Sequence, residues 1–176
     1  MSEIPEFQVR LKKPGLRIVK EELSFSNQKL TSMTYENLKI GSLSVENCEF
    51  INCTFRDIKA DKACFGGGYK QSKYRSCLFE NFDFRSTASG DALFENCTFK
   101  NIFAREFYCY QIEFINCSFS GKIKKGYFNK FLPYNLETSN RTENRLIGND
   151  FSEIIFDDFG FRGGGRFRKS KITYGE

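Results

Sequence analysis

Apolar residues recur along this chain with a period of five. A large apolar residue, most often Phe, occupies every fifth position, and a residue that is usually small or apolar stands two places before it, as in the pair Cys97/Phe99. The pattern holds in three blocks, 33–65, 77–119 and 144–161, and its register shifts between them. Neither the 3.6-residue period of a helix nor the two-residue period of a strand maintains this pattern. The pattern therefore predicts a repeat architecture.

Three nearly identical phrases indicate how the repeats are grouped. Cys77-Leu-Phe79, Cys97-Thr-Phe99 and Cys117-Ser-Phe119 are spaced twenty residues apart, which equals four units of five. Short fixed periods are typical of solenoids, in which each coil buries its apolar face against the next coil. The spacing predicts a coil with four sides, and five coils at a strand spacing of ~4.8 Å would form a rod roughly 24 Å long.

The repeated phrases resemble those of the pentapeptide-repeat family. The sequences Asn-Cys-Glu-Phe, Asn-Cys-Thr-Phe, Glu-Asn-Cys-Thr-Phe and Ile-Asn-Cys-Ser-Phe follow the motif of that family, with Phe where its members often have Leu. The resemblance covers 33–65, 77–121 and 144–163, which is more than half of the chain. It implies an all-β fold, a right-handed quadrilateral β-helix of about five coils.

The remaining segments are expected to cap or interrupt this β-helix. Residues 1–32 are predicted to form a capping hairpin, because two apolar runs flank a Pro-Gly turn at Pro14. The β-helix is predicted over 33–163, with insertions at 66–76 and 122–143, and a basic tail is predicted over 164–176. The glycines that open the first insertion are interpreted as a flexible exit from the coil.

The large residue of each repeat should form the core of the rod. We expect Phe99 to stack between Phe79 and Phe119. The predicted core residues are Phe50, Phe55, Phe79, Phe84, Phe94, Phe99, Phe114, Phe119, Phe151 and Phe156.

Most of the seven cysteines are expected to be structural. Cys48, Cys53, Cys77, Cys97 and Cys117 occupy the small inward position, where a free Cys behaves as a small apolar residue. Stacked cysteines of neighbouring coils would lie close enough for a disulfide, although a reducing compartment argues against one. Cys64 falls between two inward positions and should point outward, so it is a candidate reactive thiol.

Catalysis, cofactors and metals are not expected. The chain contains no histidine, which excludes His-based triads, His general bases and His metal ligands. Its glycine runs do not match a phosphate-binding loop, and no Cys-x-x-Cys pair is present. No apolar run is long enough to span a membrane, and the N-terminus lacks the plan of a signal peptide, so a cytoplasmic protein is predicted.

The net charge of +5 conceals two opposite contributions. Residues 33–65, 77–121 and 144–163 contain fifteen Asp and Glu against nine Lys and Arg, whereas 1–32 carries +2 and 66–76, 122–143 and 164–176 carry +3 each. Loops that project from a rigid scaffold often bind partners, and basic and aromatic residues alternate in the two insertions. The candidate partner-binding residues are Tyr69, Lys70, Lys73, Tyr74 and Arg75 in the first insertion and Lys122, Lys124, Lys125, Tyr127 and Lys130 in the second.

The sequence therefore favours a non-enzymatic protein-binding scaffold. The expected function is that of an immunity protein, which neutralises a bacterial toxin by covering its active surface. The alternative, also drawn from the family resemblance, is a DNA mimic that protects a topoisomerase such as DNA gyrase, and the acidic repeat blocks are consistent with it. Direct binding of nucleic acid through the basic segments is the least favoured alternative, and no membrane partner is expected.

Overall fold

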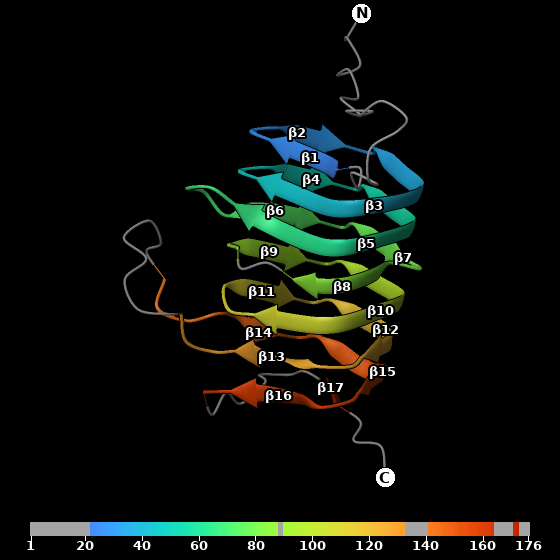
Figure 1. The fold of residues 1–176 in the computed structure, drawn as a ribbon. Helices are drawn as coiled ribbons and strands as arrows, with labels where there is room; N and C mark the ends of the chain where they lie inside the picture. The colour runs from blue at the N-terminus through green and yellow to red at the C-terminus, as the bar shows by residue number, and fades with distance from the viewer. Residues whose placement is uncertain (1–21, 88–89, 133–140, 164–170, 173–176) are drawn as a thin grey trace, which may run out of the picture.

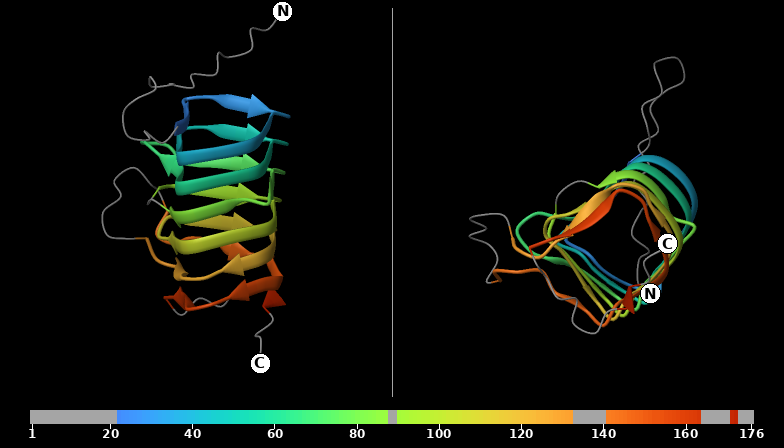
Figure 2. Two further views of the ribbon diagram at one scale, coloured as in Figure 1. Left: turned by 45° about the vertical axis from the view of Figure 1, so that its right-hand side comes forward. Right: turned by 90° about the horizontal axis from the view of Figure 1, so that it is seen from below.

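The computed structural model describes residues 22–87, 90–132, 141–163 and 171–172, and within them the chain forms a β-solenoid of about five coils (Figure 1). The described residues contain strands and no helix, and every pairing between named strands is parallel. Viewed along its axis, the rod has four sides (Figure 2). The solenoid fold predicted from the sequence is confirmed.

One side of the rod is a separate sheet of six short strands, which we call the second side. Its strands are β2 (Lys29–Thr31), β4 (Glu49–Ile51), β6 (Ser72–Arg75), β9 (Ala92–Glu95), β11 (Ile112–Ile115) and β14 (Leu146–Ile147). Each strand pairs in parallel with the corresponding strand of the next coil. The side chains of Phe50, Tyr74 and Phe94 point inward from this side and are buried.

The other three sides belong to one sheet of eleven strands, several of which bend around a corner. These are β1 (Glu22–Ser26), β3 (Thr34–Glu46), β5 (Thr54–Gly67), β7 (Leu78–Glu80), β8 (Asp83–Thr87), β10 (Thr98–Cys109), β12 (Ser118–Ile123), β13 (Gly126–Asn129), β15 (Asp150–Phe156), β16 (Phe159–Arg162) and β17 (Lys171–Ile172).

We number the sides in the order in which the chain visits them. The first side contains β1, β13, β16 and the last residues of β3 and β5, and the second side follows it. The third side begins at Thr34, Thr54 and Leu78 in successive coils. The fourth side contains 38–40, 58–60 and 83–84, and it lies across the rod from the second.

Aromatic rings stacked along the rod form the core. On the third side, Phe99 lies between Phe79, with ring centroids 4.8 Å apart, and Phe119, at 4.6 Å, and the planes are nearly parallel. Nine of the ten predicted core residues are buried, and Phe156 is partly buried and packs against the core. Aromatic pairs of this kind contribute about 0.5–1.5 kcal/mol beyond the burial of their area.

Residues with a left-handed backbone turn the chain at the corners. At the corner between the second and third sides, which we call the regular corner, φ lies between +50° and +56° at five positions: Ser32, Asn52, Ser76, Asn96 and Asn116. Asn adopts this conformation more readily than most residues other than Gly. This preference explains why Asn precedes Cys in the repeated phrases.

The solenoid begins earlier than the sequence analysis placed it. β1 and β2 form the start of a coil, because Phe25 pairs with Val45 and Leu30 with Phe50, in each case twenty residues further on. Leu23, Phe25 and Leu30 are buried. The capping role predicted for 1–32 is therefore wrong for 22–32, and the proposed hairpin lies outside the described residues, as does most of the predicted tail.

Both predicted insertions, 66–76 and 122–143, include residues that belong to regular strands. Ser72 and Tyr74 belong to a regular strand, so the first insertion ends before Ser72. The second begins after Asn129, because β12 and β13 continue the coil with Ile123 and Phe128 pointing into the core. The register slips by one residue at Gly121, which has a φ of +111° and lies so close to the Ile102 backbone that a Cβ atom would clash.

The seven cysteines are free thiols, and all except Cys64 are buried. Burial raises the pKa of Cys97 and that of Cys109 above the ordinary value for a thiol. These side chains fill the core, where the Sγ of Cys97 contacts the carbonyl oxygen of Tyr74 at 3.3 Å. Cys64 is partly exposed and lies on the first side.

Candidate functional site

Within the described residues, both long departures from the twenty-residue coil fall at one corner, the corner between the first and second sides. We call it the insertion corner. Along the second side, coils are twenty residues long except from Glu49 to Lys73, which spans 24, and from Phe114 to Leu146, which spans 32. The extra residues of both coils fall between the first side and the second. The two insertions therefore lie on the same edge of the rod.

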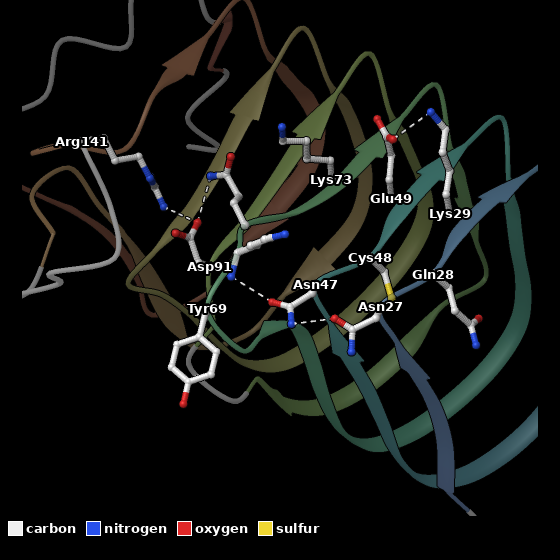
Figure 3. Close-up of a pocket in the computed structure, with 12 residues that line it drawn as sticks. Asn27, Gln28, Lys29, Asn47, Cys48, Glu49, Tyr69, Lys73, Asp91 and Arg141 are labelled. Atoms are coloured by element: carbon white, nitrogen blue, oxygen red, sulfur yellow. Dashed lines mark hydrogen bonds and ion pairs between the residues drawn. The ribbon is translucent and has the colours of Figure 1, made fainter.

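An open groove of about 910 Å³ follows this corner (Figure 3). The first insertion contributes Tyr69, Lys70 and Gln71 to its lining, and the second contributes Arg141. The coils themselves supply the other lining residues: Asn27, Gln28, Lys29, Asn47, Cys48, Glu49, Lys73 and Asp91. The site is thus assembled from segments as far apart in the sequence as Asn27 and Arg141.

A cluster of hydrogen bonds joins the two insertions. Gln71 donates from its Nε2 to Asp91 at 2.9 Å and to Glu113 at 3.0 Å. Arg141 donates from its Nη2 to the same Asp91 carboxylate at 2.6 Å, and its Nη1 lies 3.6 Å from Glu113. Two carboxylates on neighbouring coils therefore bind both insertions and hold them against each other.

Glu113 is the buried charge at the centre of this cluster, with only 1% of its side chain exposed. Arg145 donates to it from Nε at 2.6 Å and from Nη2 at 3.1 Å. Burial alone would raise the pKa of this carboxyl, but the hydrogen bonds from Arg145 and Gln71 and the charge of Arg141 outweigh burial and lower it. Glu113 is therefore ionised at neutral pH and acts as the anchor of the insertion corner.

Gly66 allows the close approach of backbones that the first insertion requires. It is buried, and a Cβ atom there would lie 1.9 Å from the carbonyl oxygen of Asp91. Asp91 in turn donates its backbone N–H to the carbonyl of Gly66 and accepts from the N–H of Ser72 at 3.0 Å. The reading of this glycine as a flexible exit is wrong, because it packs tightly beneath the groove.

The exposed side of the groove carries aromatic and cationic groups. The side chain of Tyr69 is 82% exposed and points away from the rod (Figure 3). Lys70 and Lys73 form no ion pair with any residue that the structure describes. The groove therefore presents an exposed ring and two ammonium groups that form no ion pair with a described residue.

Two residues predicted to bind a partner from the first insertion have structural roles. Tyr74 is buried and stacks between Phe50 and Phe94, and its hydroxyl donates to the carbonyl of Phe65 at 2.7 Å. Arg75 forms ion pairs with Glu49 and Glu95 on the second side. The alternation of basic and aromatic residues that suggested a loop is the inward and outward alternation of a strand.

Four of the five residues predicted in 122–143 lie elsewhere on the rod, whereas Lys130 lies where the second insertion begins. Lys122 belongs to the fourth side and pairs with Asp157 at 3.1 Å. Lys124 and Lys125 are exposed at the corner between the fourth and first sides. The five predicted residues of this segment do not form one site with the groove.

The two remaining predicted residues lie on or beside the first side. Tyr127 is buried, its ring lies 3.7 Å from the guanidinium carbon of Arg162, and burial raises its pKa to about 12. Lys130 pairs with Glu143 at 3.5 Å. Neither is a free cation or an accessible ring that a partner could bind.

On two sides of the rod, acidic residues pair with cations from neighbouring coils. On the third side, Arg56 lies 2.8 Å from Glu80 and 3.8 Å from Glu36, and Lys100 lies 2.8 Å from Glu80. On the second side, Glu49 accepts from Lys29 at 3.1 Å. The acidic repeat blocks therefore form alternating ladders of charge along these two sides.

Sequence reasoning missed several residues of the site. Gln71, Asp91, Glu113, Arg141 and Arg145 were not among the predicted residues, because each carries an ordinary polar side chain at an outward or irregular position. Only the pairing of coils brings them together. The positions of Gln71 and Arg141 inside the predicted insertions 66–76 and 122–143 were the available signals.

No protein-family model matches the chain, and searches of curated proteins and of solved structures found no significant match. The pentapeptide-repeat resemblance therefore stays a prediction from the sequence. Across the part of the chain that the structure describes, no helix could span a membrane, and no group of three His, Cys, Asp or Glu side chains is arranged to hold a metal ion.

Proposed function

We propose that this protein is a non-enzymatic binding scaffold of the pentapeptide-repeat type that recognises a protein partner through the insertion corner. The function that we favour is that of a cytoplasmic immunity protein, which covers the active surface of a bacterial toxin. The observation that carries the proposal is the joining of two insertions at one edge of an otherwise regular rod.

The arrangement suits recognition because the rod supplies rigidity and the corner supplies specific groups. Phe stacks and backbone ladders hold the coils, so the groove keeps its shape before a partner arrives. Tyr69 offers an exposed aromatic ring, the residue type enriched in the centres of protein interfaces. Loops placed on a rigid framework in this way are common sites of binding.

The pairing of charges gives the DNA-mimic alternative less support. Duplex DNA presents one negative charge per ~1.7 Å, without compensating cations of its own. In this rod Glu36, Glu49, Glu80 and Glu95 each lie beside an Arg or Lys of a neighbouring coil. A surface that alternates in sign is a poor imitation of a phosphate backbone.

The proposal is tested by co-expression with the product of the neighbouring gene. An immunity protein should be encoded beside its toxin and should co-purify with that toxin. It should also restore growth to cells that express the toxin. Absence of both a complex and protection would refute the immunity function. A change in supercoiling by purified gyrase in the presence of the protein would favour the DNA-mimic alternative instead.

A further inference from the structure

We propose that the groove at the insertion corner binds an acidic, extended segment of a protein, with carboxylates of that segment placed against Lys70 and Lys73. Only the identity of the partner, a toxin, rests on the proposed function. The inference concerns the chemistry that the groove recognises, and it is argued from the charge and the hydrogen-bonding groups of its lining.

The charges of the groove are unequally compensated. Lys29 is paired with Glu49 at 3.1 Å, and Arg141 is held by Asp91 at 2.6 Å. Lys70 is exposed, Lys73 is partly exposed, and neither has an ion-pair partner among the described residues. The lining contains four cations, Lys29, Lys70, Lys73 and Arg141, against the two carboxylates of Glu49 and Asp91, so the groove has a local excess of positive charge that attracts carboxylates.

The groove also offers groups that suit a peptide backbone. Gln28 is exposed, and its amide, which can donate and accept, forms no hydrogen bond with a described side chain or backbone group. Asn47 is already occupied, because it donates to Asn27 at 3.1 Å and accepts from the N–H of Lys70 at 2.8 Å. The hydrogen bond from Lys70 to Asn47 holds the Lys70 backbone in place beside the groove.

The same lining is unfavourable for nucleic acid. Glu49 and Asp91 belong to the wall of the groove, and Glu95 lies further along the second side. A continuous run of phosphates would pass these carboxylates, whereas a peptide can place isolated carboxylates at the two lysines and neutral groups elsewhere. The observations therefore favour a protein segment over an oligonucleotide.

The test is a titration of the full chain, labelled with ¹⁵N, with a short peptide of alternating Glu and Gly. We expect amide shifts at 69–73 and around Gln28, with no comparable shifts on the fourth side. A peptide of alternating Gln and Gly is the neutral control, and a short polythymidine oligonucleotide is the second probe. The titration needs no biological partner, so its outcome is independent of the immunity function.

Matched variants identify the contribution of the groove lysines. Lys70→Glu/Lys73→Glu should weaken binding of the Glu-Gly peptide about tenfold. Lys39→Glu/Lys59→Glu makes the same change in charge at two exposed lysines on the fourth side, across the rod, and should leave the affinity unchanged. Unchanged amide shifts at the assigned fold positions would show that both variants are folded.

Three results would overturn the inference. The first is an equal loss of affinity in both double variants, which would show that the peptide responds to net charge alone. The second is binding of the Gln-Gly peptide as tightly as the Glu-Gly peptide. The third is tighter binding of the oligonucleotide in the same groove, which would assign the site to nucleic acid.

Discussion

The regular corner and the insertion corner lie at the two ends of the same sheet, but they differ in the contacts that join neighbouring coils. At the regular corner, Asn96 and Asn116 each donate a backbone N–H to the next coil, at 2.9 Å and 2.8 Å. At the insertion corner, backbone bonds of this kind are also present, as from Asn27 to Glu46 at 2.9 Å, but side chains of the two insertions additionally reach across coils to Asp91 and Glu113. The five-residue repeats therefore determine the structure of the rod, whereas the two insertions determine where the groove forms.

The largest loss of stability is expected when a stacked ring of the repeat core is removed. Phe99→Ala should lower the free energy of unfolding by about 3–5 kcal/mol, because a cavity would replace the ring between Phe79 and Phe119. Thr98→Ser, at the adjacent outward position, should change it by less than about 0.5 kcal/mol. Urea unfolding measures both values, and a loss of less than about 1 kcal/mol for Phe99→Ala would contradict the stacking.

The next effect tests the insertion corner. Glu113→Gln should cost about 2 kcal/mol, because Arg145 and Arg141 would lose the buried charge that they share. Glu106→Gln is the matched control, because Glu106 is exposed on the first side and forms no ion pair with a described residue. If the two variants are equally stable, Glu113 does not anchor the insertions.

The ionisation of Glu113 should also make the free energy of unfolding depend on pH. The pKa of Glu113 is lowered in the folded protein, so its contribution is complete above the unfolded value of about 4.3 and is lost as pH falls through the folded value. The difference in unfolding free energy between wild type and Glu113→Gln should therefore be constant near neutral pH and shrink below about pH 4. A difference that grows under acid conditions would contradict this assignment.

A smaller effect is expected at the regular corner. Asn96 has a φ of +54°, so Asn96→Ala should cost about 1 kcal/mol, whereas Asn96→Gly should be nearly neutral. Thermal unfolding of the two variants measures this difference. Equal stability of the Ala and Gly variants would show that backbone conformation does not select Asn at this position.

The smallest effect on stability should come from the exposed lysines of the groove. Lys70→Gln/Lys73→Gln should change the free energy of unfolding by less than about 0.5 kcal/mol, because neither side chain has an ion-pair partner among the described residues. The same variant should bind the partner more weakly. A stability loss above about 1 kcal/mol would show that these lysines support the fold.

The period of five predicted most of the solenoid, and its failures have identifiable causes. Ser72/Tyr74 and Leu23/Phe25 fit the five-residue register, and extending it would have found both. Ile123 and Phe128 could not be found in this way, because a one-residue slip at Gly121 changes the phase.

The site was only partly predictable. Tyr69, Lys70 and Lys73 were identified from composition, and the structure places all three at the groove. Gln71, Arg141 and Glu113 lie far apart in sequence, and only the length of each coil determines that they meet. A repeat pattern gives the register within a coil, but it does not show which side chains an insertion will cover.

Hydrogen exchange of the protein in complex with its partner shows directly whether the two insertions form the binding surface. We predict slower exchange at the amides of 69–71 and 141–145, and unchanged exchange at Lys124 and Lys125, which are equally basic but lie at another corner. Protection at Lys124 and Lys125 without protection at the insertion corner would contradict the central claim that the two insertions form the binding surface.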